Sequence, residues 1–404
     1  MRKIIIIVLI VIAVIAAVAI YLVATTPDTT RGVALPLSAS ERELLTRVPR
    51  SAEAFALIPT AAALQETMLA NPVTHEPLLD WTAKHPLPPA WLLGGADVVL
   101  WKSGKKTSYA VRLEPFRTFV ARLWLITSSD VVARWDGKVF LINADDEQPI
   151  DAAELTSLLD FARGLPNGDA FVVQRETGRG VFPPIARPAV STVKITTKEI
   201  EIASRARAES PTATATLSSQ LPRGAMLAVA FAKPPRVVED LNRLLGTRVS
   251  ALVDNGGTIA IYDVNAGTLL PRPKGVIVAP ATAESRVAFE DIARVANLVG
   301  ETRDTGNELL VAFDRTSLPL YLKDTFAPAR WPANEWTLRL DPRRFIPILE
   351  RLGDSTGLRF AAPRLHRAAR DLRRWIRALQ NAQTIEASAS TAGGTEELRV
   401  RIGV

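Results

Sequence analysis

Residues 48–56 read VPRSAEAFA, and residues 221–229 read LPRGAMLAV. Both stretches place Pro and Arg ahead of a small residue and a run that is mostly apolar. Each is followed by a further proline and by a helical pattern, at residues 60–69 in the first case and 236–245 in the second. Because this order occurs twice, the chain is predicted to contain two related units.

Further landmarks recur in the same order along both halves. Paired glycines precede a predicted β-hairpin at residues 98–113 and another at residues 259–278. A second hairpin follows in each half. In the first half its turn is Asp136-Gly137, a pair that suits the turn types matching the twist of the strands. The second unit is therefore predicted to repeat the first at a nearly constant offset.

The predicted fold class is α+β, with an N-terminal transmembrane helix followed by two related units of antiparallel sheet with helices on one face. The predicted domains are a transmembrane anchor (residues 1–24), a linker and short helix (25–47), a first α+β repeat (48–218) and a second (219–404). The short helix is predicted to begin at a capping box formed by Ser40 and Glu43.

Residues 4–23 read IIIIVLIVIAVIAAVAIYLV and contain no charge, proline or glycine. A helix of about 20 residues is roughly 30 Å long, which matches the hydrocarbon core of a bilayer. Surface helices of globular proteins normally show a polar face, which is missing from this sequence. The stretch therefore predicts a single membrane-spanning helix.

Arg2 and Lys3 precede this stretch, so the positive-inside rule places the N-terminus in the cytoplasm. The predicted location is the bacterial cytoplasmic (inner) membrane, with a single pass and a periplasmic or extracellular body. The alternative is a cleaved signal peptide. Leu22 and Val23 make a poor cleavage site because both side chains are bulky, so a retained anchor is favoured.

Three alanines of the predicted anchor, Ala13, Ala16 and Ala17, share one helix face. Small residues permit the close backbone approach that helix packing in lipid needs. One interpretation is that this face packs on integral-membrane protein partners. The alternative is that the alanines only dilute a lipid-facing anchor.

The formal net charge is +7. A basic protein can bind nucleic acid, an anionic membrane or an acidic partner. The predicted location argues against nucleic acid. A helical pattern at residues 365–380 has one apolar face, and its other side could form a basic surface for anionic membrane lipid or an acidic partner. The alternative is a face of solvated arginines. The residues in question are Arg364, Arg367, Arg370, Arg374 and Arg377.

Little in the sequence predicts chemistry, and no catalytic, cofactor-binding or metal-binding residues are expected. The chain has no cysteine, which excludes thiol nucleophiles and iron–sulfur ligation. His75, His85 and His366 are far apart, and the first two lie in a proline-rich predicted loop. The acidic run at residues 145–147 could hold a cation weakly, although a plain acidic loop is the commoner reading.

Pro49, Pro166, Pro222 and Pro332, with their neighbours, mark the starts of similar stretches. In this outline the chain resembles single-pass, membrane-anchored bacterial envelope proteins of unknown function with duplicated α+β units. The resemblance covers the body in outline only and implies no site.

The leading hypothesis is a non-catalytic accessory or scaffold subunit of a larger bacterial membrane complex, with a photosynthetic or respiratory assembly as the first case to test. The alternative is an envelope binding protein that holds a lipid or peptide between sheet and helices. A third class, an enzyme, would need a cleft with paired carboxylates or histidines.

Overall fold

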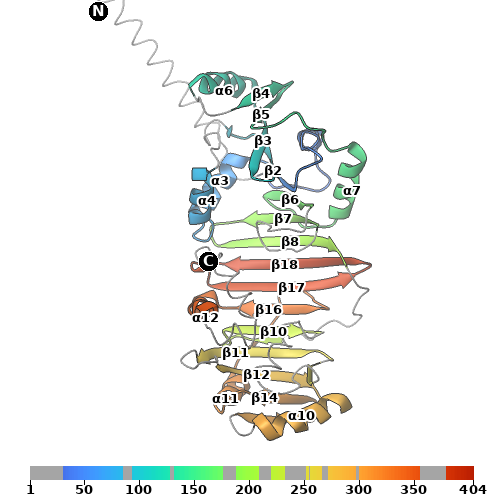
Figure 1. Ribbon diagram of the computed structural model, residues 1–404, viewed down its shortest axis with the longest axis vertical. Coiled ribbons are helices and arrows are strands. Elements are labelled where there is room, and N and C mark those ends of the chain that lie inside the picture. Colours follow the sequence, from blue (N-terminus) through green and yellow to red (C-terminus); the bar gives the residue numbers. More distant parts are fainter. Residues whose placement is uncertain are drawn as a thin grey trace, which may run out of the picture. The chain divides into compact units, whose positions relative to one another are not determined.

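The computed structural model describes residues 31–84, 93–127, 132–175, 188–208, 220–232, 252–253, 255–265, 272–296, 300–354 and 379–404. The chain divides into two compact units, Met1–Arg207 and Ala208–Val404, which are called unit 1 and unit 2 below. Figure 1 labels most of their helices and strands.

Unit 1 is built on an antiparallel sheet with the strand order β8-β7-β6-β1-β2-β3-β5-β4. Its strands are β1 (Ala54–Ile58), β2 (Asp97–Ser103), β3 (Lys106–Arg112), β4 (Ala133–Asp136), β5 (Val139–Ile142), β6 (Ala170–Gln174), β7 (Ala189–Ile195) and β8 (Glu199–Arg207). All four residues of β5, VFLI, are buried. A strand without a polar face needs cover on both sides of the sheet.

Unit 2 contains an antiparallel sheet with the order β13-β14-β12-β11-β10-β16-β17-β18 and a short ladder of β9 with β15. The sheet strands are β10 (Leu227–Phe231), β11 (Gly257–Asn265), β12 (Arg272–Pro280), β13 (Glu301–Asp304), β14 (Glu308–Ala312), β16 (Trp336–Leu340), β17 (Thr384–Ala392) and β18 (Thr395–Gly403). The ladder joins β9 (Gln220–Pro222) to β15 (Phe326–Pro328).

The two sheets are connected in the same way. In each, the first strand (β1 or β10) pairs with the second strand in sequence and with the sixth. Outside the main sheets, Pro49 bridges to Pro149, and Pro222 pairs with Phe326 at the corresponding place. The hydrogen-bond registers therefore match individual positions of unit 1 to positions of unit 2.

Helices cover both faces of the sheet in unit 1. They are α2 (Ala39–Leu45), α3 (Ala61–Ala70), α4 (His75–Lys84), α6 (Pro115–Thr127) and α7 (Ala152–Ala162). One core cluster joins Leu44 of α2 and Leu155 of α7 to Phe55 of β1. The other joins α3 and α6 to Val98 of β2. The prediction of helices on one face is therefore wrong, because strands such as β5 are apolar on both sides.

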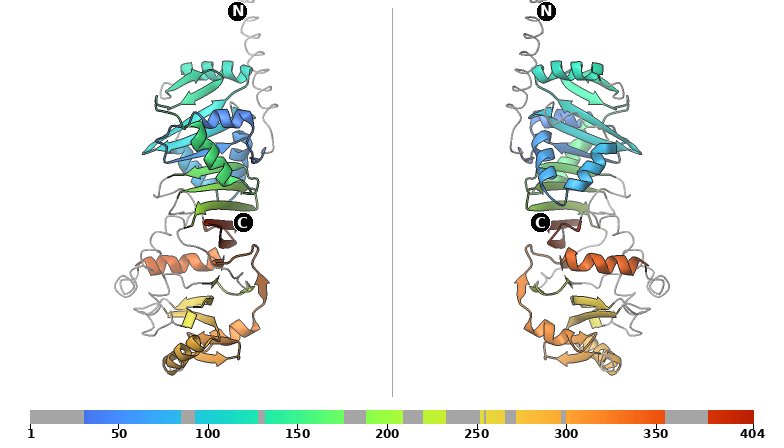
Figure 2. Two further views of the ribbon diagram at one scale, coloured as in Figure 1. Left: turned by 90° about the vertical axis from the view of Figure 1, so that its right-hand side faces the viewer. Right: turned by 90° about the vertical axis from the view of Figure 1, so that its left-hand side faces the viewer.

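Unit 2 also has helices on both faces. They are α10 (Ala283–Ala296), α11 (Ser317–Lys323) and α12 (Pro342–Asp354). Leu318 of α11 packs with Ala228 of β10, whereas Ile292 of α10 packs with Ile259 of β11 on the other side. Figure 2 shows α12 on one side of the sheet and the segment with β15 on the other.

Two predicted local features have clear outcomes. The second hairpin of the first half is confirmed, because β4 and β5 pair, but its turn lies one residue later than predicted: Asp136 pairs with Val139, and the turn residues are Gly137, with a positive φ of 59°, and Lys138. The predicted capping box is two residues too late. The N-cap of α2 is Ser38, whose hydroxyl accepts from the amide of Glu41, and the Glu41 carboxylate accepts from the amide of Ser38. Ser38 has the same spacing to Glu41 as Ser40 has to Glu43, so the pattern alone did not separate the two.

The predicted membrane-spanning helix is not supported. Residues 4–23 lie outside the described residues, and no helix in the described part of the chain is long and apolar enough to cross a membrane. The longest described helix, α10, has 14 residues. At 1.5 Å per residue that is about 21 Å, short of the roughly 30 Å of a bilayer core. The fold class with a transmembrane helix, the single-pass description and the inner-membrane location are accordingly withdrawn.

Candidate functional site

The sequence-predicted interaction residues lie outside the described residues. This holds for Ala13, Ala16 and Ala17 and for the whole predicted basic surface, Arg364, Arg367, Arg370, Arg374 and Arg377. The structure therefore brings none of them to a site, and the candidate site rests on other residues.

The residues considered for chemistry are also placed differently from expectation where they are described. His75 lies in α4 and not in a loop, with its Nδ1 2.6 Å from the carbonyl oxygen of Leu69. Pro77 falls in the first turn of α4, where a missing amide hydrogen does no harm. The three carboxylates of residues 145–147 each accept a hydrogen bond from a different side chain, those of Lys106, Arg134 and Ser51. Within the described ranges, no group of three or more His, Cys, Asp or Glu side chains could hold a metal ion.

The most distinctive surface is one face of β16, β17 and β18 in unit 2. Alternate residues of a strand point to opposite faces, and in these strands the two faces differ sharply. Thr337 of β16 pairs with Ser388 of β17, which pairs with Arg399 of β18. In the neighbouring row, Arg339 pairs with Glu386, which pairs with Arg401. We call these six residues the open face, in which Thr337 and Ser388 are buried and the four charged residues are partly exposed. The alternate positions of the same strands carry mainly apolar side chains, such as Leu338, Ile385 and Ile402.

Two ion pairs on and beside the open face are long. Arg401 lies 3.6 Å from Glu386, with side chains 30% and 28% exposed. Arg399 lies 3.8 Å from Glu397, at similar exposure. Exposed pairs of this kind contribute about 0–1 kcal/mol and exchange partners readily. Arg339 stands beside Glu386 in the ladder, but no ion pair or hydrogen bond joins its side chain to another described residue.

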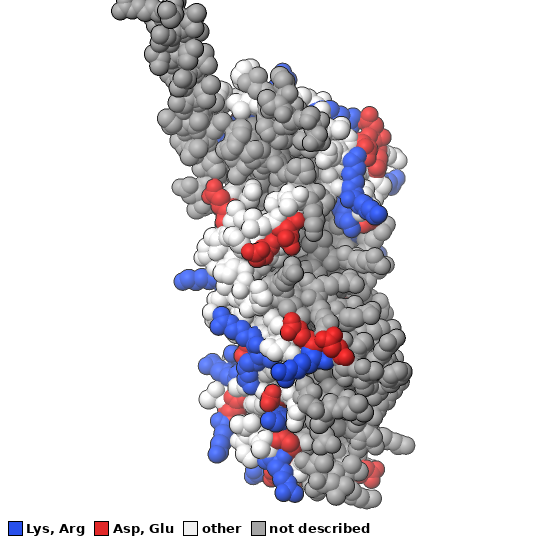
Figure 3. Space-filling model, turned by 60° about the vertical axis from the view of Figure 1, so that its left-hand side comes forward, with Lys and Arg blue, Asp and Glu red and all other residues white. Residues whose placement is uncertain are grey.

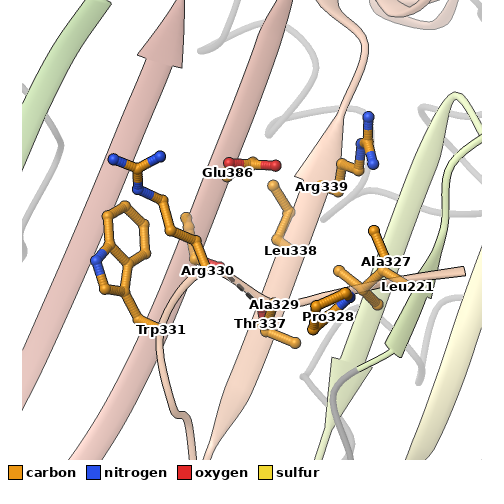
Figure 4. Close-up of a pocket in the computed structure, with 11 residues that line it drawn as sticks. Leu221, Ala327, Pro328, Ala329, Arg330, Trp331, Thr337, Leu338, Arg339 and Glu386 are labelled. Carbon is orange, nitrogen blue, oxygen red and sulfur yellow. Dashed lines mark hydrogen bonds between the residues drawn. The ribbon is translucent and has the colours of Figure 1, made fainter.

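A shallow pocket lies along one side of the open face. Its volume is about 290 Å³, including space open to solvent. Thr337, Arg339 and Glu386 form part of its lining, and the segment from Ala327 to Trp331 forms another part. The Arg330 guanidinium stands over the Trp331 ring at 5.6 Å, a cation–π arrangement. Figure 4 shows the side chains of Arg330, Arg339 and Glu386 spread around the pocket.

The segment from Ala327 to Trp331, called the pocket segment below, is fixed by hydrogen bonds of residues on both sides of it. On one side, Asp324 accepts hydrogen bonds from the amide of Gly224 at 2.9 Å and from the hydroxyl of Tyr262 at 3.0 Å. Burial, followed by the nearby charge of Asp324, raises the pKa of Tyr262 above its ordinary value, so this hydroxyl remains a donor. On the other side, Asn334 bonds the backbone of Thr391 through both ends of its amide.

Local sequence explains why β17 and β18 present this face. They are joined by Gly393-Gly394, and both glycines have positive φ, 57° and 76°. A two-residue turn with two positive φ angles matches the twist of a hairpin. The register is thereby fixed, and Glu386, Glu397, Arg399 and Arg401 fall on one side.

The open face is suited to binding and offers little for bond chemistry. Guanidinium groups are permanently charged and donate several hydrogen bonds to carboxylates or phosphates. No histidine lies among the pocket-lining residues described. Figure 3 shows basic and acidic side chains interspersed over the described surface of unit 2. The arrangement favours recognition of a particular acidic pattern over general attraction of anions.

Sequence reasoning missed this site, although one signal for its sheet face was present. The alternation of polar and apolar residues on both sides of Gly393-Gly394 is typical of a hairpin with one solvated face. The pocket segment had no signal of its own, since its role depends on what the sheet leaves uncovered. Comparisons of the chain with protein-family models, with curated proteins and with solved structures find no match.

Proposed function

We propose that this chain is a non-catalytic accessory or scaffold subunit, which binds a partner protein of a larger assembly. The observation that carries the proposal is the open face of unit 2, a charged stretch of sheet beside a shallow pocket, with Arg339 unpaired among the described residues. Guanidinium groups and an aromatic ring at one place are typical of protein interfaces.

The chemistry of the described residues supports binding over catalysis. The pocket combines arginines, one glutamate and small side chains, and contains neither paired carboxylates nor a nucleophile next to a base. A lipid-binding role would need an enclosed apolar cavity. This pocket is open and has charged groups in its lining, so the proposal names a protein partner.

The test is isolation of the chain under gentle conditions from its native cells, followed by measurement of the particle mass. A scaffold or accessory subunit should be recovered in an assembly of fixed stoichiometry, heavier than one copy of the chain. Recovery as a monomer at every extraction condition would overturn the proposal. So would turnover of a substrate by the purified chain that is lost on substitution of Glu386 or another pocket residue.

A further inference from the structure

Matched ladder positions differ in character between the two units. In unit 1 the row that crosses β1, β6, β7 and β8 reads Phe55, Val173, Val190 and Arg205. In unit 2 the row that crosses β10, β16, β17 and β18 reads Ala228, Arg339, Glu386 and Arg401. The arginine at the end of the row is common to both, whereas the apolar middle of unit 1 is replaced by charge in unit 2.

In unit 1 this face is covered by α7. Val173 and Val190 share a core cluster with Leu155 of α7. The arginine at the end of the row, Arg205, donates to the carbonyl oxygens of Phe161 at 3.1 Å and Arg163 at 2.5 Å, which are freed at the C-terminus of α7. One terminus of the covering helix is therefore held by this arginine.

The N-terminus of α7 is held through its carboxylates. Asp151 is the N-cap residue, and its carboxylate lies 2.9 Å from a guanidinium nitrogen of Arg50. Glu154, in the first turn, lies 2.9 Å from Arg175 and 3.7 Å from Arg50. Arginines of unit 1 thus form ion pairs with the acidic residues at the N-terminus of α7 and donate hydrogen bonds to the carbonyl oxygens at its C-terminus.

Unit 2 keeps two of these arginines but has no described helix across the same strands. Pro222 matches Pro49, so Arg223 stands at the place of Arg50, and Arg401 stands at the place of Arg205. Residues 329–335 run directly from β15 to β16 where unit 1 inserts α7. No ion pair or side-chain hydrogen bond joins Arg223 to another described residue.

We propose that the open face of unit 2 binds an acidic helical segment of a partner protein, in the place that α7 occupies in unit 1. The inference rests on the proposed function and names the chemistry of the partner. Arg401 donates to the C-terminal carbonyl oxygens of the segment, as Arg205 does in unit 1. Arg223 and Arg339 pair with its carboxylates. Because the open face is charged, the helix face that packs on it must be polar, unlike the leucine-rich face of α7.

Charge complementarity sets the sign of the partner. The surface around the segment would contain Arg223, Arg330, Arg339, Arg399 and Arg401 against Glu386 and Glu397. The net charge of this surface is positive. Glu386 and Glu397 would nevertheless repel a segment that carried a carboxylate at every position. We therefore expect carboxylates in two groups, at the start and along the middle of the helix, and not a uniformly acidic chain.

The experiment uses the full chain and a fluorescein-labelled helical peptide about four turns long, with Glu in its first turn and at its centre and Ala elsewhere. Binding is followed by fluorescence anisotropy. We expect binding that weakens with added salt. The variant R339Q/R401Q should weaken it roughly tenfold. The matched control K105Q/K198Q removes two exposed charges from turns of unit 1 and should change binding by less than about twofold.

Three comparison ligands complete the test. Replacing every Glu of the peptide by Gln should abolish binding, and two central prolines, which break a helix, should weaken it. Binding by the proline peptide at full strength would overturn the helical part of the proposal. Single-stranded DNA that binds as tightly, with the same loss in R339Q/R401Q, would overturn the assignment to a protein partner.

The outcomes separate this inference from the proposed function. If a native assembly is found and R339Q/R401Q joins it at the normal yield, the inference about the open face is wrong and the scaffold function stands. If the chain is monomeric and the peptide does not bind, both fail. Circular dichroism and amide exchange in β16–β18 confirm that the variant is folded, so a loss of binding reports on the surface.

Discussion

At the matched positions of β6 and β7 in unit 1 and of β16 and β17 in unit 2, Val173 and Val190 are replaced by Arg339 and Glu386. Both pairs lie in antiparallel sheets with the same strand order. The valines are about 1% exposed, whereas the Glu386 side chain is 28% exposed. One inserted helix, α7, accounts for the difference, because a sheet face that a helix covers must be apolar and an uncovered one can be polar.

The topology and the surface of the two units are therefore set by different residues. The turns and the buried rows specify strand order, and these are present in both units. The segment before the sixth strand decides whether one face becomes core or surface. A binding face can therefore be gained by shortening one connection, without any change in the order of the sheet.

The largest effect is expected for Val173→Arg, which gives unit 1 the residue of unit 2. Val173 is 1% exposed in the cluster that includes α7, so the new guanidinium would be buried without a partner. Uncompensated buried charges cost about 3–5 kcal/mol. Urea denaturation should show a loss of that size, with amide exchange accelerated in α7. A loss below about 1 kcal/mol would mean that α7 does not seal this face.

A smaller effect separates Arg205 from Arg401, the arginines at the end of the two matched rows. Arg205→Ala removes two hydrogen bonds to carbonyl oxygens at the C-terminus of α7 and should cost about 1–2 kcal/mol. Arg401→Ala removes a partly exposed ion pair with Glu386 that is 3.6 Å long, and it should cost less than Arg205→Ala, about 1 kcal/mol or below. Both variants are measured by the same urea denaturation. Equal losses of unfolding free energy would contradict the proposal that a helix covers this sheet face in unit 1 and not in unit 2.

These two cases also show which parts of the molecule could be predicted. The hairpin of β4 and β5 was predictable because its signal is local, an Asp-Gly pair just before the apolar residues of β5. The helix α7 was not predicted, yet Asp151, Glu154 and the apolar residues Leu155, Leu158 and Leu159 have the spacing of a capped amphipathic helix. The open face could not be found locally, because the local sequence does not show which segment packs over β16 and so whether Arg339 is buried or partly exposed.

A third prediction concerns Asp97, a carboxylate that unit 1 buries. Burial, opposed by the Arg31 guanidinium 2.5 Å away, raises the pKa of Asp97 above its ordinary value of 3.8. Between 3.8 and the raised value the native state binds more protons than the unfolded state. The contribution of Asp97 to the free energy of unfolding therefore falls as pH rises through that interval.

The variant Asp97→Asn cannot titrate, so the difference in unfolding free energy between wild type and variant should shift against the wild type as pH rises from below 3.8 towards neutrality. Urea denaturation at several pH values measures this difference. Glu386→Gln on the open face is the matched control, and a similar pH trend in both variants would show that burial is not its cause.

The smallest effect on stability, and the sharpest test of the comparison, is expected for Arg339→Val. The substitution gives the open face the residue that unit 1 has at Val173. Arg339 is half-buried and has no ion pair or hydrogen bond with another described residue, so no favourable contact is lost. Valine also suits a strand. The free energy of unfolding should therefore stay within about 0.5 kcal/mol of wild type. Binding of the acidic peptide should nevertheless fall severalfold, because a charge that the peptide would meet is gone. A variant that loses several kcal/mol would show that Arg339 is a buried structural residue, and the two matched faces would then differ in side chain but not in role.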